Sequence, residues 1–174
     1  MADDFSPTVI QQPIPIADMT PLERLVLSLI FDAESDGEAV YFHTSLGPSD
    51  AIGLSIDELR AAFDASAEID STAAAYIAER VAVASTDDTE IEIDFSGTSW
   101  EFIFQDIVRR SSTLRYVTAV TSFTCSKMRP DGFGGMAVLI TADAILGKST
   151  NDIIEDFLVE MDADAAEQRL APVG

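Results

Sequence analysis

Cysteine, histidine and tryptophan are almost absent from this chain of 174 residues, which contains one of each. The single cysteine, Cys125, excludes an intrachain disulfide and is typical of a protein from a reducing compartment. One histidine, His43, and one cysteine cannot supply the ligands of a zinc site. A Cys–His nucleophilic pair needs the fold to bring both side chains together. The sequence therefore favours two unrelated structural residues.

Targeting and cofactor-binding signals are also missing. The first 19 residues have neither the basic nor the apolar segment of a secretory signal, and no uninterrupted apolar run reaches a membrane-spanning length. The glycine-rich loop at 131–135 precedes an expected strand, which favours a hairpin turn over a phosphate loop. The acidic clusters at 87–90 and 160–164 lack the glycine and spacing of a calcium loop. We therefore expect a cytoplasmic protein that binds no metal and no cofactor.

Basic residues are scarce, with 10 lysines and arginines against 31 acidic residues, which gives a net charge of −21. Direct binding to nucleic acid or to an anionic membrane is disfavoured, because both interactions need cationic side chains. The same charge can attract a basic protein partner. Solubility alone is a plainer explanation of the acidity, and it stays open.

The length and the 47% content of hydrophobic residues fit one globular domain. A chain of this size buries about 70% of the surface that its unfolded form exposes, so its core needs no disulfide or metal. The prolines near the start predict an extended N-terminal arm over residues 1–19. A single domain is expected over 20–161, followed by a C-terminal tail over 162–174.

The hydrophobic pattern predicts five helices and four strands. The expected helices cover about 20–32, a segment following Ser55, 70–85, 99–110 and 149–161, and the expected strands cover 38–43, 89–95, 114–125 and 136–142. Their order, α-β-α-α-β-α-β-β-α, predicts a single α+β domain with helices packed on a mostly antiparallel sheet of about four strands. Thr20 and Glu23 form a capping box at the first helix. In the last helix, Ile153, Phe157, Leu158 and Met161 are expected to face the core.

The strand at 89–95 alternates strictly between apolar and acidic residues. Ile91, Ile93 and Phe95 fall on one face, and Glu90, Glu92 and Asp94 fall on the other. A period of two with one charged face predicts a strand with one side in water. The three carboxylates are candidate binding residues for a basic partner.

Half of the basic residues lie in one acid-free segment at 109–129. They are Arg109, Arg110, Arg115, Lys127 and Arg129. This segment could bind an anion or an acidic peptide, or it could meet the acidic face of another copy. The plainer alternative is internal compensation, with Arg115 across from Glu92 or Asp94 and with Arg109 and Arg110 at a helix C-terminus.

These observations favour a non-enzymatic acidic protein that binds a basic protein partner, with a nucleic-acid mimic as a sharper version and a homodimer as one arrangement. The alternative is a small-anion or small-molecule binding protein, or an enzyme, that uses the basic 109–129 segment. A third hypothesis is an accessory subunit whose exposed apolar patch marks its interface. An enzyme is the less favoured reading, because no catalytic constellation stands out.

Overall fold

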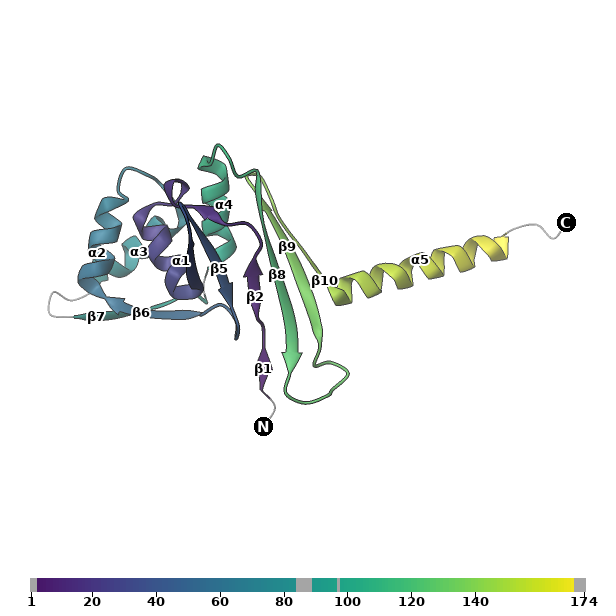
Figure 1. The fold of residues 1–174 in the computed structure, drawn as a ribbon. Helices are drawn as coiled ribbons and strands as arrows, with labels where there is room; N and C mark the ends of the chain where they lie inside the picture. Colours follow the sequence, from purple (N-terminus) through teal and green to yellow (C-terminus); the bar gives the residue numbers. More distant parts are fainter. Residues whose placement is uncertain (1–2, 84–88, 97, 171–174) are drawn as a thin grey trace.

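The computed structural model describes residues 3–83, 89–96 and 98–170, with side chains described up to residue 163. Figure 1 shows helices α1–α4 gathered at one side of the molecule, a long sheet beside them, and α5 projecting away on the other side. The elements run in the order β1 (Asp4–Phe5), β2 (Thr8–Ile10), β3 (Ile14–Pro15), a short 3₁₀ helix (Ile16–Asp18), α1 (Pro21–Ile30), β4 (Asp32–Asp36), β5 (Ala39–Thr44), β6 (Ala51–Ser55), α2 (Ile56–Ala65), α3 (Thr72–Val83), β7 (Glu90–Asp94), α4 (Trp100–Arg110), β8 (Tyr116–Cys125), β9 (Gly134–Thr141), β10 (Ile145–Ser149) and α5 (Thr150–Leu170).

The main sheet has eight strands, and its pairings are all antiparallel. Its central path is β10-β9-β8-β2-β5-β3, with β1 paired to β8 and β4 paired to β5. Strand β2 joins the two parts of this sheet, because Thr8 pairs with Thr44 of β5 on one side and with Thr121 of β8 on the other. Strands β6 and β7 form a separate two-stranded sheet.

The core lies between the helices and the inner face of the main sheet. Phe31, Phe42, Trp100 and Phe104 form an aromatic cluster with edge-to-face contacts, including Phe42–Phe104 at 5.9 Å between ring centres. Phe42 on β5 and Phe104 on α4 are fully buried. Edge-to-face geometry suits the ring quadrupoles and fixes how α4 sits against the sheet.

The expectation of about four strands and of the order α-β-α-α-β-α-β-β-α is wrong. The structure is α+β, but five helices accompany an eight-stranded antiparallel sheet and a separate two-stranded sheet. The missed strands β1, β2, β3, β4, β6 and β10 are two to five residues long. Strands this short place at most three residues on one face, and their extended state comes from pairing with a neighbour rather than from local propensity.

The local signals were more informative at α1 and at the long hairpin. The capping box is confirmed, since the Thr20 side chain accepts from the Glu23 amide at 3.1 Å and a Glu23 carboxylate oxygen accepts from the Thr20 amide at 2.8 Å. The predicted hairpin of the two long strands is confirmed as β8 and β9, which pair from Tyr116–Thr141 to Phe123–Gly134.

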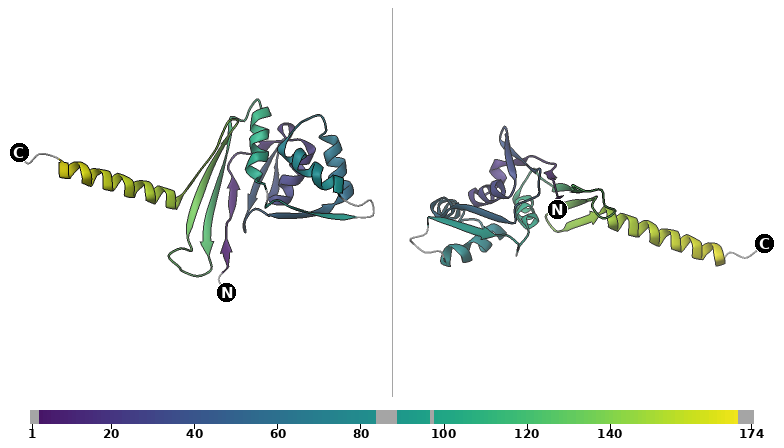
Figure 2. Two further views of the ribbon diagram at one scale, coloured as in Figure 1. Left: turned by 180° about the vertical axis from the view of Figure 1, so that it is seen from behind. Right: turned by 90° about the horizontal axis from the view of Figure 1, so that it is seen from below.

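The final helix departs from the expectation that it packs on the core. Figures 1 and 2 show α5 projecting from the end of β10 away from the rest of the protein. Ile153, Phe157, Leu158 and Met161, which were expected to face inward, are all exposed. The helical periodicity was correct, but the sequence could not show that no element within the described residues covers this face.

Candidate interaction surfaces

Strand β7 carries a row of three exposed carboxylates. Glu90, Glu92 and Asp94 face solvent, whereas Ile93 between them is fully buried. The structure thus confirms the predicted strand with one side in water. The partner residues on β6 are Ser55, Gly53 and Ala51, all exposed and uncharged. Small neighbours leave the carboxylates accessible over the whole face of this two-stranded sheet.

One end of this row is held by hydrogen bonds. The Ser96 amide donates to Oδ1 of Asp94 at 2.8 Å, and the Tyr76 hydroxyl donates to the Asp94 carbonyl. Hydrogen bonding from the Ser96 side chain and amide, with a smaller contribution from nearby Arg80, keeps the pKa of Asp94 below its usual value. Asp94 therefore stays ionised at neutral pH and below.

A second row of carboxylates lies on β4, an edge strand of the main sheet. Asp32, Glu34 and Asp36 alternate along the strand and are all exposed. Glu34 lies 3.1 Å from His43 of β5, whose ring stacks on Tyr41. The sequence analysis missed this row because DAESD lacks β-branched and aromatic residues. Its spacing of one acid every second residue was the available signal.

Arg110 of the basic segment points into the protein, toward a buried acid. Its guanidinium lies 2.5 Å from Oε2 of Glu23, whose side chain is fully buried, and it also reaches the Asp18 carbonyl. Oε1 of Glu23 has no hydrogen-bond partner among the described residues. Arg110 therefore neutralises a buried carboxylate and fastens the last turn of α4 to the first turn of α1.

Arg109 and Arg129 also have acidic neighbours. Arg109 contacts Asp106 at 3.1 Å and donates to the Ala142 carbonyl at 2.7 Å. Arg129 lies 3.3 Å from Asp4 and 3.8 Å from Asp131. The plainer alternative, internal compensation, thus describes these two residues and Arg110.

Arg115 and Lys127 lie at opposite ends of β8, and within the described residues neither has an acidic group at ion-pair distance. The considered pairing of Arg115 with Glu92 or Asp94 is wrong, because β7 pairs with β6. Twelve residues of roughly extended chain separate the two cations by about 40 Å. The structure therefore does not bring the five bases together at one point.

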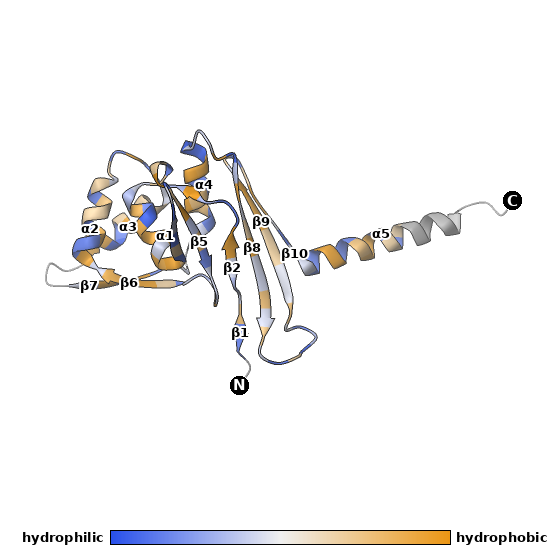
Figure 3. Ribbon diagram, in the orientation of Figure 1, coloured by the Kyte–Doolittle hydropathy of each residue, from blue (hydrophilic) through white to orange (hydrophobic). Residues whose placement is uncertain are grey.

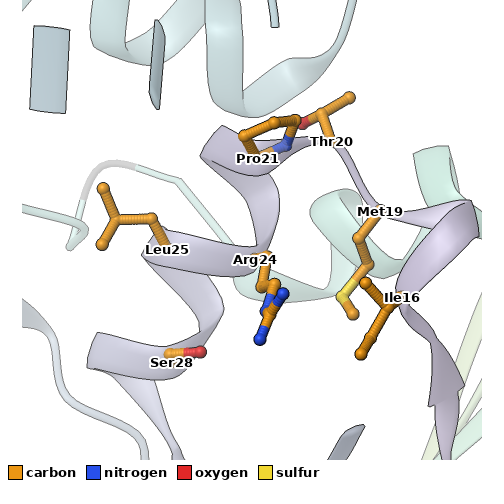
Figure 4. Close-up of a pocket in the computed structure, with 7 residues that line it drawn as sticks. All are labelled: Ile16, Met19, Thr20, Pro21, Arg24, Leu25 and Ser28. Carbon is orange, nitrogen blue, oxygen red and sulfur yellow. The ribbon is translucent and has the colours of Figure 1, made fainter. Parts of the chain in front are cut away.

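The hollows on the described surface are open to solvent, and they bring few charged side chains together. One hollow, of about 520 Å³, lies beside α1 and is lined by Arg24 together with the apolar residues Ile16, Met19 and Leu25 (Figure 4). Another hollow, of about 390 Å³, includes Arg129 together with Asp4 and Asp131, which offset its charge. Neither hollow combines several bases of the 109–129 segment.

No protein family, curated protein or solved structure matches this chain. Within residues 3–83, 89–96 and 98–170, no three histidine, cysteine or carboxylate side chains gather as a metal site requires. In the same ranges no helix combines the length and apolar content needed to cross a bilayer.

The structure also locates two further candidates from the sequence, the Cys–His pair and the acidic clusters. His43 lies on β5 opposite Val9, which in turn pairs with Val120, so Cys125 lies five residues farther along β8. This offset alone is about 16 Å, and the Cys–His pair is not formed. Of the acidic clusters, Asp87 and Asp88 and the side chain of Asp164 lie outside the described residues, while Glu160 and Asp162 are exposed on α5.

Proposed function

We propose that this chain is a non-enzymatic interaction protein whose acidic surface binds a basic protein partner. The observation that carries the proposal is the accessible row of Glu90, Glu92 and Asp94 on β7. Three of the five bases of the 109–129 segment already have acidic neighbours elsewhere, so they do not offset the charge of the β7 row.

The spacing of the row defines what it recognises. Alternate residues of a strand lie about 6.5–7 Å apart, so the three carboxylates span about 13 Å along β7. An extended segment with lysine or arginine at every second residue has the same repeat. Charge-assisted hydrogen bonds to such a segment are favourable, and long-range attraction speeds the encounter.

A nucleic-acid mimic is the sharper form of this proposal. Its partner is then a DNA- or RNA-binding protein, whose cations contact the carboxylates where phosphates otherwise lie. The exposed acidic row on β4 supports this form, because it repeats the same alternation on a second strand. Competition by duplex DNA for the captured partner distinguishes a mimic from other acidic binding proteins.

The alternative, a small-anion or small-molecule binding protein or enzyme that uses the basic 109–129 segment, has less support. Arg109, Arg110 and Arg129 have acidic neighbours, and Arg115 and Lys127 lie far apart. Isothermal titration with inorganic phosphate and sulfate checks it directly. Binding that Lys127→Ala abolishes would favour this alternative.

The test compares two triple variants with the same change in charge. One variant carries Glu90→Gln, Glu92→Gln and Asp94→Asn on β7. The control carries Glu58→Gln, Asp64→Asn and Glu68→Gln, which are exposed on or just after α2. Each tagged protein is used for affinity capture from a lysate of the source organism, with stepwise elution in salt.

We expect a basic protein to be retained by the unmodified chain and by the α2 control, and to be lost from the β7 variant. Elution at moderate salt is expected because exposed charge pairs are screened within about 10 Å at 0.1 M salt. Equal loss from both variants would mean that net charge alone holds the partner. Equal retention by both would refute the assignment to β7.

A further inference from the structure

Helix α5 carries an apolar stripe that no part of the described chain covers. Along the helix, Ile153, Phe157 and Met161 recur at intervals of four, and Ile154 and Leu158 lie beside them. These five residues, the α5 stripe, are between 40% and 62% exposed, and Figure 3 shows the apolar residues in the first half of the helix. An isolated helix in water is marginal, so a stripe of this kind indicates a missing contact.

The outer face of the sheet is a second uncovered apolar surface. Antiparallel register places Val9, Val120 and Ala137 side by side across β2, β8 and β9, and places Leu139 next to Leu146 of β10. Val120 and Leu146 are 41% and 59% exposed. A shallow hollow of about 340 Å³ lies over β9 and β10 between these side chains. We call these five residues the outer sheet face.

The charges of the two surfaces are compatible, because one is acidic and the other carries no acid. Strands β8, β9 and β10 contain no acidic residue, and Lys148 lies at the rim of the outer sheet face. Residues 150–163 of α5 carry five acids and no base: Asp152, Glu155, Asp156, Glu160 and Asp162. In a chain with a net charge of −21, the acid-free surface of β8, β9 and β10 is a place where an acidic amphipathic helix meets little repulsion.

The junction of β10 and α5 keeps the stripe away from the sheet of its own chain. The strand passes into the helix without a loop, at Ser149 and Thr150. Ser149 and Asp152 cap the helix reciprocally, and Lys148 forms an ion pair with Asp156. At 100° per residue, Asp152 and Asp156 lie on the opposite side of α5 from the stripe. The side of the helix anchored to the strand is thus the acidic one.

We propose that two copies of this chain form a reciprocal dimer in which the α5 stripe of each copy packs on the outer sheet face of the other. A two-fold axis relates the two copies, so the contact between stripe and outer sheet face occurs twice, as expected for an isologous interface. Packing of α5 against α5 instead would place the acids that flank the stripe, Glu155, Glu160 and Asp162, beside those of the other copy. This dimer leaves the β7 carboxylates free, so it stands independently of the proposed function.

The first test measures the mass of the full chain by light scattering at micromolar concentration. The expected value is 37.4 kDa, twice the 18.7 kDa of one chain. Phe157→Glu on the α5 stripe and Val120→Glu on the outer sheet face should each raise the dissociation constant about 30-fold or more, as expected for a buried hot-spot residue. Phe157 and Val120 are 62% and 41% exposed in the single chain, so we expect both variants to fold, and circular dichroism of each variant checks this.

Matched controls carry the same substitution at exposed apolar residues outside the two surfaces. Val159→Glu lies on the acidic side of α5, and Leu46→Glu follows β5; they are 69% and 67% exposed. Both variants should remain dimeric. A monomeric unmodified chain, or a dimer that survives Phe157→Glu or Val120→Glu, would overturn the proposal.

A cross-linking experiment identifies what lies against the stripe. Leu146→Cys and Phe157→Cys are made in separate chains, mixed, and treated with a short bismaleimide. The expected product is a dimer that joins one chain of each kind. Two results would overturn the proposal. The first is a cross-link between two Phe157→Cys chains, which shows that α5 packs on α5. The second is a cross-link inside a single chain that carries both changes, which shows that α5 folds back on its own sheet.

Discussion

Large apolar side chains are buried in the region around α4 but exposed along β10 and α5. Around α4, Phe42 and Phe104 are fully buried, and the aromatic cluster is closed by Trp100 and Phe31. Along β10 and α5, Leu146 and Phe157 are 59% and 62% exposed. The first set stabilises the single chain. The second set contributes little to a single chain and is available to an interface.

The largest effect is expected where burial is complete, and a neighbour in the same helix provides the control. Phe104→Ala should lower the free energy of unfolding by about 3–5 kcal/mol, because it removes a buried ring and leaves a cavity. Phe102→Ala, at a residue that is 46% exposed, should change it by about 0.5 kcal/mol or less. Urea unfolding measures both, and similar losses would erase the distinction between the two kinds of apolar residue.

A comparable distinction is expected for the two arginines at the end of α4. Arg110→Ala should destabilise the protein by about 3–5 kcal/mol, because it leaves the buried Glu23 carboxylate without its cation. Arg109→Ala should lose about 1 kcal/mol or less, since its side chain is half exposed. Thermal unfolding at pH 7 measures the difference. A small loss from Arg110→Ala would mean that Glu23 is not held as a charged pair.

Removal of a helix cap is expected to have a smaller effect, and that effect should differ between α1 and α5. Thr20→Ala removes half of a buried capping box and should lower the global free energy of unfolding by about 1 kcal/mol. Ser149→Ala should leave global unfolding unchanged and increase amide exchange in the first turns of α5, because that helix is attached to the fold only at its start. A global loss from Ser149→Ala would show that α5 is part of the cooperative core.

The smallest effect is a pH dependence confined to α5. Hydrogen bonds from the Ser149 amide and side chain lower the pKa of Asp152 from its usual value of 3.8. A lowered folded-state pKa adds stability that is complete above pH 3.8 and is lost as the pH falls through the folded-state value. The protection of amides 150–155 against exchange, relative to the unfolded chain at the same pH, should therefore fall below pH 3.8, and Asp152→Asn should remove this pH dependence.

The sequence predicted features that local chemistry determines. The alternation of Ile93 with Glu92 and Asp94 was sufficient to predict β7 and its solvent face, and Thr20 with Glu23 predicted the start of α1. These features depend on residues within three positions of one another. Period and capping are therefore readable without knowledge of the fold.

Features that depend on distant partners could not be predicted. Strand β4 is extended because Asp32 and Glu34 pair with His43 and Tyr41 of β5. The acid that meets Arg110 lies 87 residues away, at Glu23. For α5 the stripe was visible in the sequence, but whether the same chain covers it depends on the direction in which the helix leaves β10.

The position of β2 at the centre of the sheet has a consequence for synthesis on the ribosome. Thr8 bonds to Thr121 across 113 residues of chain, so β2 cannot complete its pairing until β8 has emerged. At about 5–20 residues per second, this wait lasts about 6–23 s. During this time, each nascent chain exposes an unpaired strand edge to the other chains that are translated from the same mRNA. Mutual repulsion between strongly acidic chains keeps these edges apart until each protein has made its own β8.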